Sequence, residues 1–275
     1  MSLAISTNVA SMTAQSALTK TQQALNTSFT RLSSGSRING AGDDAAGLGI
    51  AKSMHAQVRS YGVAERNTND GISMVQTADG GAEEIHGIMT RMRELAVQAS
   101  NSSLSANDYT NLDTEYQQHS AEIDRIASST QFNGINLLAG VAANKNVQVG
   151  IGTAATDRIA VSFGGADVTR LLGGATDVTT FATAQTSITA IDTGIQALSA
   201  VRAKFGSALN RLSSTVSNLQ TMQTNTAASL SRIQDTDVAR ESSNLAKNQV
   251  LAQAGAAILA QANQSPQLAQ GLLRG

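Results

Sequence analysis

The stretch "IQALSAVRAKFGSALNRLSSTVSNLQTMQTNTAASLSRI", residues 195–233, decides the fold of this chain. Apolar or small side chains recur along it at alternating steps of three and four residues, which is typical of the contact face of a coiled-coil helix. These positions are Ile195, Leu198, Phe205, Leu209, Leu212, Val216, Leu219, Ala227 (one residue out of the strict register), Leu230 and Ile233. About 40 residues at roughly 1.5 Å each make a helix of about 60 Å. The sequence therefore predicts a long helical rod.

Two further stretches carry the same spacing, and each predicts a helix that packs through one apolar face. The longer stretch has its apolar or small positions at Tyr61, Ala64, Thr68, Ile72, Val75, Ala78, Ala82, Ile85, Met89, Met92 and Ala96. The shorter stretch has them at Leu112, Tyr116, His119, Ile123 and Ile126. The fold class that we expect is mainly α, with long helices in coiled-coil contact.

A short polar break, "SNSSLSAND" at residues 100–108, separates these two helices. Ser105, followed three residues later by Asp108, is typical of a capping box that begins a helix. Because helices joined by a short connection usually lie side by side, we expect an antiparallel hairpin here.

This expected hairpin brings together side chains that are distant in the sequence. Folding about residue 103 places Leu95 near Leu112. The same geometry places Arg91 and Arg93 near Glu115. We therefore expect a cluster of charged side chains where the two helices face each other.

The composition supports long helices and excludes several classes of protein. The 275-residue chain has no Cys, no Trp and one proline, Pro266, and aromatic residues make up 3% of it. Scarce proline favours uninterrupted helices, because proline removes a donor and clashes with the preceding turn. The lack of cysteine excludes disulfides, thiolate catalysis and Cys-based zinc sites. The net charge of −1 gives no electrostatic reason to expect nucleic acid as a partner.

One region of the chain predicts β structure. In "NVQVGIG" (residues 146–152) and "RIAVSF" (residues 158–163), every second residue is apolar, as in half-buried strands. The five residues "TAATD" between them predict a hairpin loop. The Gly-rich segments that follow, "FGGADVT" and "LLGGATDVT", are expected to connect this hairpin to the last long helix.

The two ends of the chain differ from this interior. Residues 1–30 carry one charged side chain, Lys20, and residues 248–273 carry none. Both ends are expected to be helical, with weak apolar faces at Ala14, Leu18, Thr21, Leu25, Phe29 and Leu32, and at Leu251, Ala254, Ile258 and Ala262. Such helices are marginal alone, so we interpret both ends as assembly surfaces that pair with each other and with other chains. The residues expected to carry polymerisation are Leu18, Leu25, Phe29, Leu32, Leu251, Ile258 and Leu259.

Neither end predicts membrane insertion or a cleaved leader. Residues 248–273 are long enough to span a bilayer. Eight of them are Asn or Gln, however, and burying so many amides in lipid is costly. The N-terminal stretch "MSLAISTNVASMTAQSA" has no basic start and no continuous apolar block, so we expect no secretory signal peptide.

The stretch "RINGAGDDAAGLGIA", residues 37–51, resembles a dinucleotide-binding loop, because Gly40, Gly42 and Ala45 follow the spacing G-x-G-x-x-A. The context opposes this interpretation. An amphipathic helix precedes the loop instead of a buried strand, and Asp43 and Asp44 would repel a phosphate. We expect instead a break between two helices.

In this break, Gly35 and Gly40 are expected to end the first helix. Asp43 or Asp44 is expected to cap the second helix against its dipole. Gly40, Gly42, Asp43 and Asp44 thus form an expected inter-domain connection. An enzyme that uses this Gly-rich loop is the alternative from a different class of protein.

No other pattern predicts a catalytic, metal or cofactor site. The three histidines, His55, His86 and His119, are too far apart in the sequence for a local metal motif. The motifs H-E-x-x-H, G-x-S-x-G and the P-loop do not occur. His119 lies on an expected apolar face, where a partly buried, hydrogen-bonded histidine is commoner than a ligand.

Several blocks of the sequence together resemble bacterial flagellin, the subunit of the flagellar filament. The blocks are "ALNTSFTRLSSGSRINGAGDDAAGLGIA", "NTNDGISMVQTADGGAEEI", "RMRELAVQASN", "EIDRIASSTQFNGINLLAG", "FGSALNRLSSTVSNL" and "SRIQDTDVARESSNLAKNQVLAQAGAAILAQANQSPQLAQGLLR". The resemblance covers both ends of the chain, in the same order as in the family. It implies no enzymatic activity and no cofactor.

The resemblance also implies a division of the chain. Residues 1–43 and 236–275 would form the two halves of an inner coiled coil in the filament core. Residues 44–235 would form a helical rod domain with a β-hairpin region at about 137–178. Larger flagellins insert outer domains in the middle, where this chain has only about 40 residues, so we expect a short flagellin without outer domains.

The resemblance also implies where the chain acts, in an extracellular filament that assembles from exported subunits. The expected partners are further copies of the chain, an export chaperone, the flagellar type III export apparatus, and the filament cap and hook–filament junction proteins. A cell-surface Toll-like receptor recognises the family at the helix that here reads "RMRELAVQ". Arg91 and Leu95 match its contact positions and Glu115 matches the acidic partner, although the same patch is also a contact between subunits. A hook–filament junction protein is the related alternative.

Overall fold

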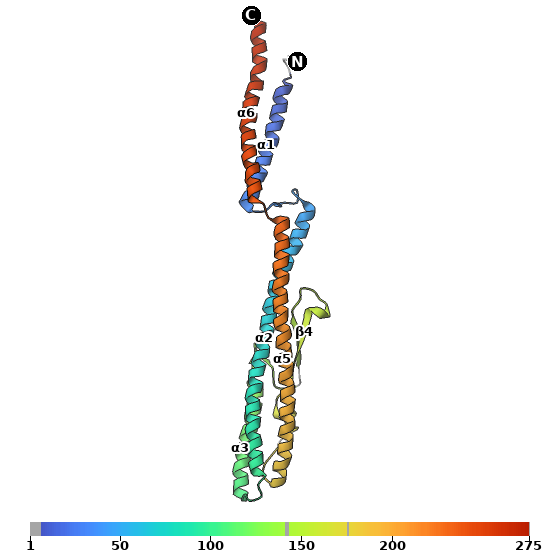
Figure 1. Cartoon of the computed structure of the whole chain (residues 1–275), viewed down its shortest axis with the longest axis vertical. Helices are drawn as coiled ribbons and strands as arrows, with labels where there is room; N and C mark the ends of the chain where they lie inside the picture. The colour runs from blue at the N-terminus through green and yellow to red at the C-terminus, as the bar shows by residue number, and fades with distance from the viewer. Residues whose placement is uncertain (1–6, 141–142, 175, 275) are drawn as a thin grey trace. The chain divides into compact units, whose positions relative to one another are not determined.

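The computed structural model describes residues 7–140, 143–174 and 176–274 (Figure 1). The chain forms two compact units, which are described separately. The interior unit comprises Gln57–Thr224, and the terminal unit comprises Met1–Ala56 together with Asn225–Gly275.

Two long helices, α2 (Ala45–Ala99) and α5 (Phe181–Gln234), run antiparallel through the interior unit, and α3 (Ala106–Ser129) packs beside them (Figure 1). Three polar contacts along α2 and α5 show that the two helices are antiparallel. They join Glu65 to Gln220, Asp79 to Arg202, and Arg93 to Asp192. The prediction of a mainly α fold with long packed helices is confirmed.

The core of the interior unit consists of the apolar faces that the sequence predicts. Its fully buried side chains include Val75, Ile85, Met89, Met92, Tyr116, Ile123, Leu198, Phe205 and Leu212. Many of the remaining core positions are alanines, so the helices pack closely without large rings. Phe163 and Phe205 form the one aromatic pair among the described residues, with ring centroids 5.7 Å apart.

The connection between α2 and α3 ends in the cap that was predicted to begin α3. The backbone N–H of Ser105 donates to Asp108 Oδ2 at 2.9 Å, and the N–H of Asp108 donates to Ser105 Oγ at 3.3 Å. This reciprocal pair is the capping box that the sequence predicts. The two helices fold back on each other, so the predicted hairpin is confirmed.

The predicted β-hairpin is present, with different bounds. Strands β3 (Ala143–Gln148) and β4 (Arg158–Phe163) are antiparallel, and the connection between them is longer than the five residues expected. The backbone N–H groups of Val149 and Gly150 both donate to the carbonyl oxygen of Asp157. The "VGIG" segment therefore forms hydrogen bonds inside the loop and does not continue the pairing of β3 with β4.

A second, smaller sheet was not predicted. Strands β1 (Gln131–Phe132) and β2 (Ile135–Asn136) pair across the dipeptide Asn133–Gly134. Both turn residues have positive φ, 48° at Asn133 and 75° at Gly134, which suits a two-residue hairpin turn. The Asn-Gly dipeptide was the sequence signal that could have identified this turn. Further along, the Gly-rich connection contains a short helix, α4 (Val168–Leu171).

The terminal unit is built on α1 (Val9–Ser34) and α6 (Val238–Arg274), which lie side by side (Figure 1). The predicted pairing of the two ends is confirmed. The chain leaves helical structure after Ser34 and again after Gln234, whereas the predicted boundaries lie at 43/44 and 235/236. The assignment of these segments as filament core and rod domain stays a prediction, and residues 1–6, 141–142, 175 and 275 within them lie outside the described residues.

Candidate functional site

The contact face between α1 and α6 is made of small and polar residues as much as of apolar ones. On α1 the covered face carries Ala14, Leu18, Thr21, Leu25, Ser28 and Leu32, and on α6 it carries Leu245, Asn248, Ala252, Gly255, Leu259 and Ala262. A Cβ added at Gly255 would lie 3.3 Å from Cδ1 of Leu18, so the two helices approach closely there. Asn8 Nδ2 donates to the carbonyl oxygen of Ala262 at 2.8 Å. These contacts pair the start of α1 with the later part of α6, so the helices are antiparallel.

The larger apolar side chains of this pair point away from the contact face. Phe29 is 65% exposed, Ile258 60% and Leu251 46%. Val9, Met12, Val238 and Val250 are also exposed. Phe29, Leu251 and Ile258, which were expected on the weak apolar faces of the two ends, therefore lie outside the contact between α1 and α6. The helices pack closely instead through the neighbouring small residues Ser28, Ala252 and Gly255.

Leu18, Leu25, Leu32 and Leu259 lie on the face between α1 and α6, and their expected role in polymerisation stays a prediction. Phe29, Leu251 and Ile258 instead point outward from the two helices, and no described residue of the chain covers them. No helix in the described part of the chain is long and apolar enough to cross a membrane.

The loop between α1 and α2 is held by its own aspartates. Asp43 Oδ2 accepts the backbone N–H groups of Asn39 at 3.0 Å and Gly40 at 3.1 Å. These bonds hold the pKa of the Asp43 carboxyl below its ordinary value. Asp44 Oδ1 accepts the N–H of Gly47 at 2.8 Å, so Asp44 is the residue that caps α2.

The glycines of this loop have different roles from those expected. Gly35 ends α1 in the left-handed conformation, with φ 69°, as predicted. Gly40 lies further on, within the loop that Asp43 closes, and does not end the helix. Because the N–H groups of Asn39, Gly40 and Gly47 already bind the carboxylates of Asp43 and Asp44, these donors are occupied, and the negative charge of the two aspartates opposes a phosphate.

The two segments that leave the terminal helices bind each other. The N–H of Arg37 donates to the carbonyl oxygen of Gln234 at 2.6 Å, and the N–H of Thr236 donates to that of Gly35 at 2.9 Å. The guanidinium of Arg37 also donates to the carbonyl oxygen of Ile233 at 2.7 Å, at the end of α5. The connection is therefore a paired ribbon, which sequence reasoning on residues 40–44 alone missed.

The predicted charged cluster lies on the surface of the interior unit. Arg91 Nη2 donates to Glu115 Oε1 at 2.9 Å, and Arg91 Nη1 donates to Glu94 Oε2 at 3.0 Å. The hydrogen bond from Arg91 lowers the pKa of Glu115, and both carboxylates raise the pKa of Arg91. His119 is half-buried on the next turn, with Nε2 3.7 Å from Glu115 Oε1.

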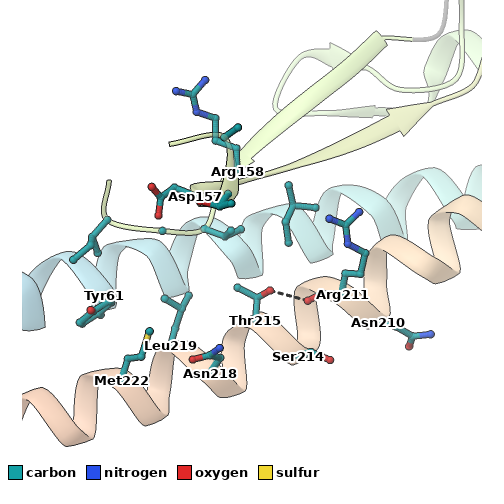
Figure 2. A pocket seen from close by; sticks show the side chains of 16 residues that line it. Tyr61, Asp157, Arg158, Asn210, Arg211, Ser214, Thr215, Asn218, Leu219 and Met222 are labelled. Carbon is teal, nitrogen blue, oxygen red and sulfur yellow. Dashed lines mark hydrogen bonds between the residues drawn. The ribbon is translucent and has the colours of Figure 1, made fainter. Parts of the chain in front are cut away.

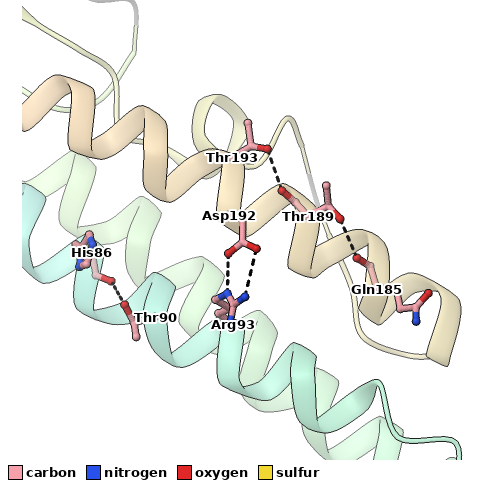
Figure 3. A network of polar contacts seen from close by, with 7 residues as sticks. All are labelled: His86, Thr90, Arg93, Gln185, Thr189, Asp192 and Thr193. Atoms are coloured by element: carbon pink, nitrogen blue, oxygen red, sulfur yellow. Dashed lines mark hydrogen bonds and ion pairs between the residues drawn. The ribbon is translucent and has the colours of Figure 1, made fainter.

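Leu95 and Arg93, the other two residues that the predicted hairpin places near this cluster, differ in outcome. Leu95 is 1% exposed, so it belongs to the core and supports the surface from beneath. Arg93 pairs with Asp192 of α5 at 2.6 Å and not with Glu115 (Figure 3). Arg93 therefore ties α2 to α5, while Arg91 ties α2 to α3.

A groove on the interior unit has no counterpart in the sequence analysis. It lies between α2, α5 and the loop that follows β3, and its volume is about 920 Å³ (Figure 2). Tyr61, Leu219 and Met222 contribute apolar surface, and Arg158 and Arg211 contribute charge. The histidines and carboxylates of the described residues form no cluster of three that could hold a metal ion.

Comparison with known proteins gives matches over nearly the whole chain. Residues 5–143 match the bacterial flagellin N-terminal helical region, and residues 188–273 match the bacterial flagellin C-terminal helical region. Flagellin of Bacillus subtilis (strain 168) is 37% identical over 98% of this chain and 99% of its own. The flagellar filament 31.3 kDa core protein of Treponema maltophilum is 37% identical over the same shares of the two chains. The crystal structure of Bacillus cereus flagellin, 38% identical, matches with a TM-score of 0.51 over 60% of this chain and 94% of that one.

Proposed function

This chain belongs to the bacterial flagellin family, and we propose on that premise that its terminal unit carries the contacts between subunits. The chain is a structural subunit that self-assembles into the bacterial flagellar filament, and it belongs to the flagellum. The relatives that it matches over nearly their whole length are flagellins and filament core proteins, so a junction protein is not favoured. The role that we propose is structural and involves no catalysis.

The outward apolar surface of the terminal unit is the observation that supports this proposal. A monomer in water exposes Phe29, Leu251 and Ile258 on helices that carry almost no charge. Burying a large apolar side chain contributes about 1.5–3 kcal/mol. Neighbouring copies that cover these residues therefore stabilise the filament.

Seeded growth tests this function. Purified monomer added to short filament fragments is expected to extend them into long filaments of uniform diameter, seen by electron microscopy. The variant Leu251→Gln/Ile258→Gln is expected to stay monomeric, because amides at these exposed positions remove the apolar contact while leaving the monomer folded. A double substitution at two other exposed positions of α6, Lys247 and Gln253, serves as the matched control for this variant. Monomer that never extends the fragments contradicts the proposed role.

We further propose the partners that the family implies. They are an export chaperone, the flagellar type III export apparatus, the filament cap and the hook–filament junction proteins. Export by that apparatus would deliver the chain to the extracellular filament without a cleaved signal peptide. Release of full-length chain into the medium, dependent on the apparatus, is the expected observation.

A receptor role is proposed for the cluster of Arg91 and Glu115, with Leu95 beneath it. What supports it is an exposed ion pair held by two helices at a distance of 2.9 Å. Arg91→Ala or Glu115→Ala is expected to lower signalling by cells that carry the Toll-like receptor. Arg125→Ala, which removes an exposed ion pair with Glu122 elsewhere on α3, is the matched control. Unchanged signalling by the first two variants would leave the cluster as a contact between subunits alone.

A further inference from the structure

The chain contains two Asn-Gly dipeptides, Asn39–Gly40 and Asn133–Gly134, and their surroundings differ. In such a pair the backbone nitrogen of the glycine can attack the side-chain carbonyl carbon of the asparagine, because glycine has no Cβ to obstruct the approach. The attack requires that this nitrogen and the side-chain amide are free to meet. The hydrogen bonds at each pair therefore decide whether it reacts in the folded chain.

The first pair is held by the loop that precedes α2. Asp43 Oδ2 accepts the N–H groups of Asn39 at 3.0 Å and Gly40 at 3.1 Å, and Asn39 Nδ2 donates to the carbonyl oxygen of Ser36 at 3.0 Å. The nitrogen of Gly40 has to give up its bond before it can attack. The carboxylate beside it also disfavours the negative charge of a deprotonated nitrogen. Asn39 is exposed, so its protection comes from these bonds and not from burial.

The second pair forms the exposed turn between β1 and β2. The hydrogen bonds of the described residues leave both the side-chain amide of Asn133 and the N–H of Gly134 without a partner. A Cβ added at Gly134 would have no other atom within 4 Å, so the turn is also uncrowded. The two reacting groups of this pair are therefore free.

We propose that Asn133 is a site of spontaneous deamidation in the folded chain, whereas Asn39 is protected. The nitrogen of Gly134 loses its proton to solvent and forms a bond to Cγ of Asn133. The bond from Cγ to Nδ2 breaks, and the amide nitrogen leaves as ammonia after taking a proton from solvent. Water then opens the resulting five-membered succinimide ring at one of its two carbonyl groups, which leaves aspartate or isoaspartate at position 133. Water is the one co-reactant, no group is oxidised or reduced, and the site does not depend on the proposed filament function.

The two products have different effects on the turn. Aspartate tolerates a positive φ almost as well as asparagine, so it adds one negative charge and keeps the turn. Isoaspartate carries the main chain through its side-chain carbon and so inserts a methylene group between residues 133 and 134. A two-residue turn then no longer fits the pairing of Phe132 with Ile135.

This hairpin also holds the end of α3. Asn136 Nδ2 donates to the carbonyl oxygens of Ala127 at 3.2 Å and Ser128 at 2.6 Å. The N–H of Leu137 donates to the carbonyl oxygen of Thr130 at 3.0 Å. The last carbonyl groups of a helix have no partner within the helix, so these bonds stabilise its end. Isoaspartate is therefore expected to loosen the last turn of α3.

Incubation of the full-length monomer in mildly alkaline buffer tests the proposal, because one sample reports both sites. Trypsin releases residues 38–52 and 126–145 as separate peptides, and mass spectrometry measures the conversion of each asparagine to an acid. Asn133 is expected to deamidate roughly tenfold faster than Asn39 or more, because a hydrogen bond to a charged group must break at the first pair. In guanidinium chloride, which removes the folded structure at both sites, the two rates are expected to converge.

Asp43→Ala is the matched variant, since it frees the N–H groups of Asn39 and Gly40 without changing the hairpin. It is expected to raise the rate at Asn39 toward that at Asn133 and to leave the rate at Asn133 unchanged. Circular dichroism checks that the helices are retained. Equal rates at the two sites in the folded wild-type chain, or conversion of Asn133 only in guanidinium chloride, would overturn the proposal.

The structural consequence is measured on the products. An isoaspartyl methyltransferase, with S-adenosylmethionine as methyl donor, detects isoaspartate in the aged chain. Amides of residues 124–129 are expected to exchange hydrogen faster in chain enriched in isoaspartate than in the variant Asn133→Asp, whose turn is intact. Equal exchange in these two chains would overturn the expected loosening of α3.

Discussion

The interior and terminal units are both built on paired long helices, yet they place their large apolar residues on opposite sides. In the interior unit Phe205 is fully buried and packs against Phe163. In the terminal unit Phe29 is 65% exposed, and small residues such as Ser28 and Gly255 fill the contact face. The interior unit therefore has a core that is complete within one chain, whereas the terminal unit leaves large apolar side chains exposed, which we propose that other chains cover.

Removing part of the terminal unit should give the largest effect. Deletion of residues 1–30, or of residues 245–275, is expected to abolish polymerisation because the outward apolar surface is lost. The interior unit is expected to stay folded, since its core residues all lie in Gln57–Thr224. Sedimentation of mixtures with filament fragments measures the first outcome, and circular dichroism measures the second. Normal polymerisation by either truncated chain would contradict the division of roles.

A pair of Phe→Ala substitutions sharpens the comparison. Phe205→Ala is expected to lower the free energy of unfolding of the monomer by about 3–5 kcal/mol, because it leaves a cavity in a closed core. Phe29→Ala is expected to change it by less than about 0.5 kcal/mol, because the ring is exposed in the monomer. Urea unfolding of both monomers gives the two values. Equal losses would mean that Phe29 is already packed in the monomer.

A smaller effect is expected at the start of α2. Asp44→Ala removes the carboxylate that accepts the N–H of Gly47, and should cost about 1 kcal/mol of helix stability. Hydrogen exchange is expected to quicken in the first turn of α2 and to stay unchanged near Ile85 in the interior core. Asp44→Asn, which keeps an accepting side-chain oxygen, should restore most of the protection.

The smallest effect is the response to pH. Hydrogen bonds from Arg91, Arg93 and Arg125 lower the pKa values of Glu115, Asp192 and Glu122 in the folded chain. A carboxylate with a lowered pKa contributes stability above its unfolded pKa and loses it as the pH falls through the folded pKa. The interior unit should therefore lose a little stability as the pH drops through and below the ordinary carboxylate range. The loss should be small, because these groups are exposed.

Comparing melting temperatures at neutral and acidic pH, with and without salt, checks this response. The neutral variant Arg91→Gln/Glu115→Gln should show a flatter pH profile than the wild-type chain. In the terminal unit, hydrogen bonds from the backbone N–H groups of Asn39 and Gly40 lower the pKa of the Asp43 carboxyl. A terminal unit that lost more stability in acid than the interior unit would reverse the expected order.

The sequence predicted the interior unit better than the terminal unit, for a physical reason. In the interior, the side chains at the predicted spacing are large and buried, as at Ile85, Met92 and Leu198. In the terminal helices Phe29 and Ile258, expected on the apolar faces, are exposed, and small residues pair the two helices. Hydrophobic periodicity identifies a buried face but not which molecule buries it.

The site was predicted in part. Arg91 and Glu115 meet as the helical hairpin required, because the turn length and cap fixed the register. Arg93 could not be assigned to Asp192 without knowing how α5 packs against α2. The groove also depends on the antiparallel pairing of segments more than 100 residues apart, which local patterns do not specify. The small sheet at Asn133–Gly134 was identifiable from its turn dipeptide and was missed.

Hydrogen exchange on monomer and filament tests the central claim most directly. The claim is that α1 and α6 gain their main apolar packing from neighbouring copies, whereas α2, α3 and α5 have theirs within one chain. Amides of Val9–Ser34 and residues 238–264 are therefore expected to exchange quickly in the monomer and to become strongly protected in the filament. Amides around Met89, Ile123 and Leu212 are expected to be protected in both states. Terminal amides as protected in the monomer as in the filament would contradict the account.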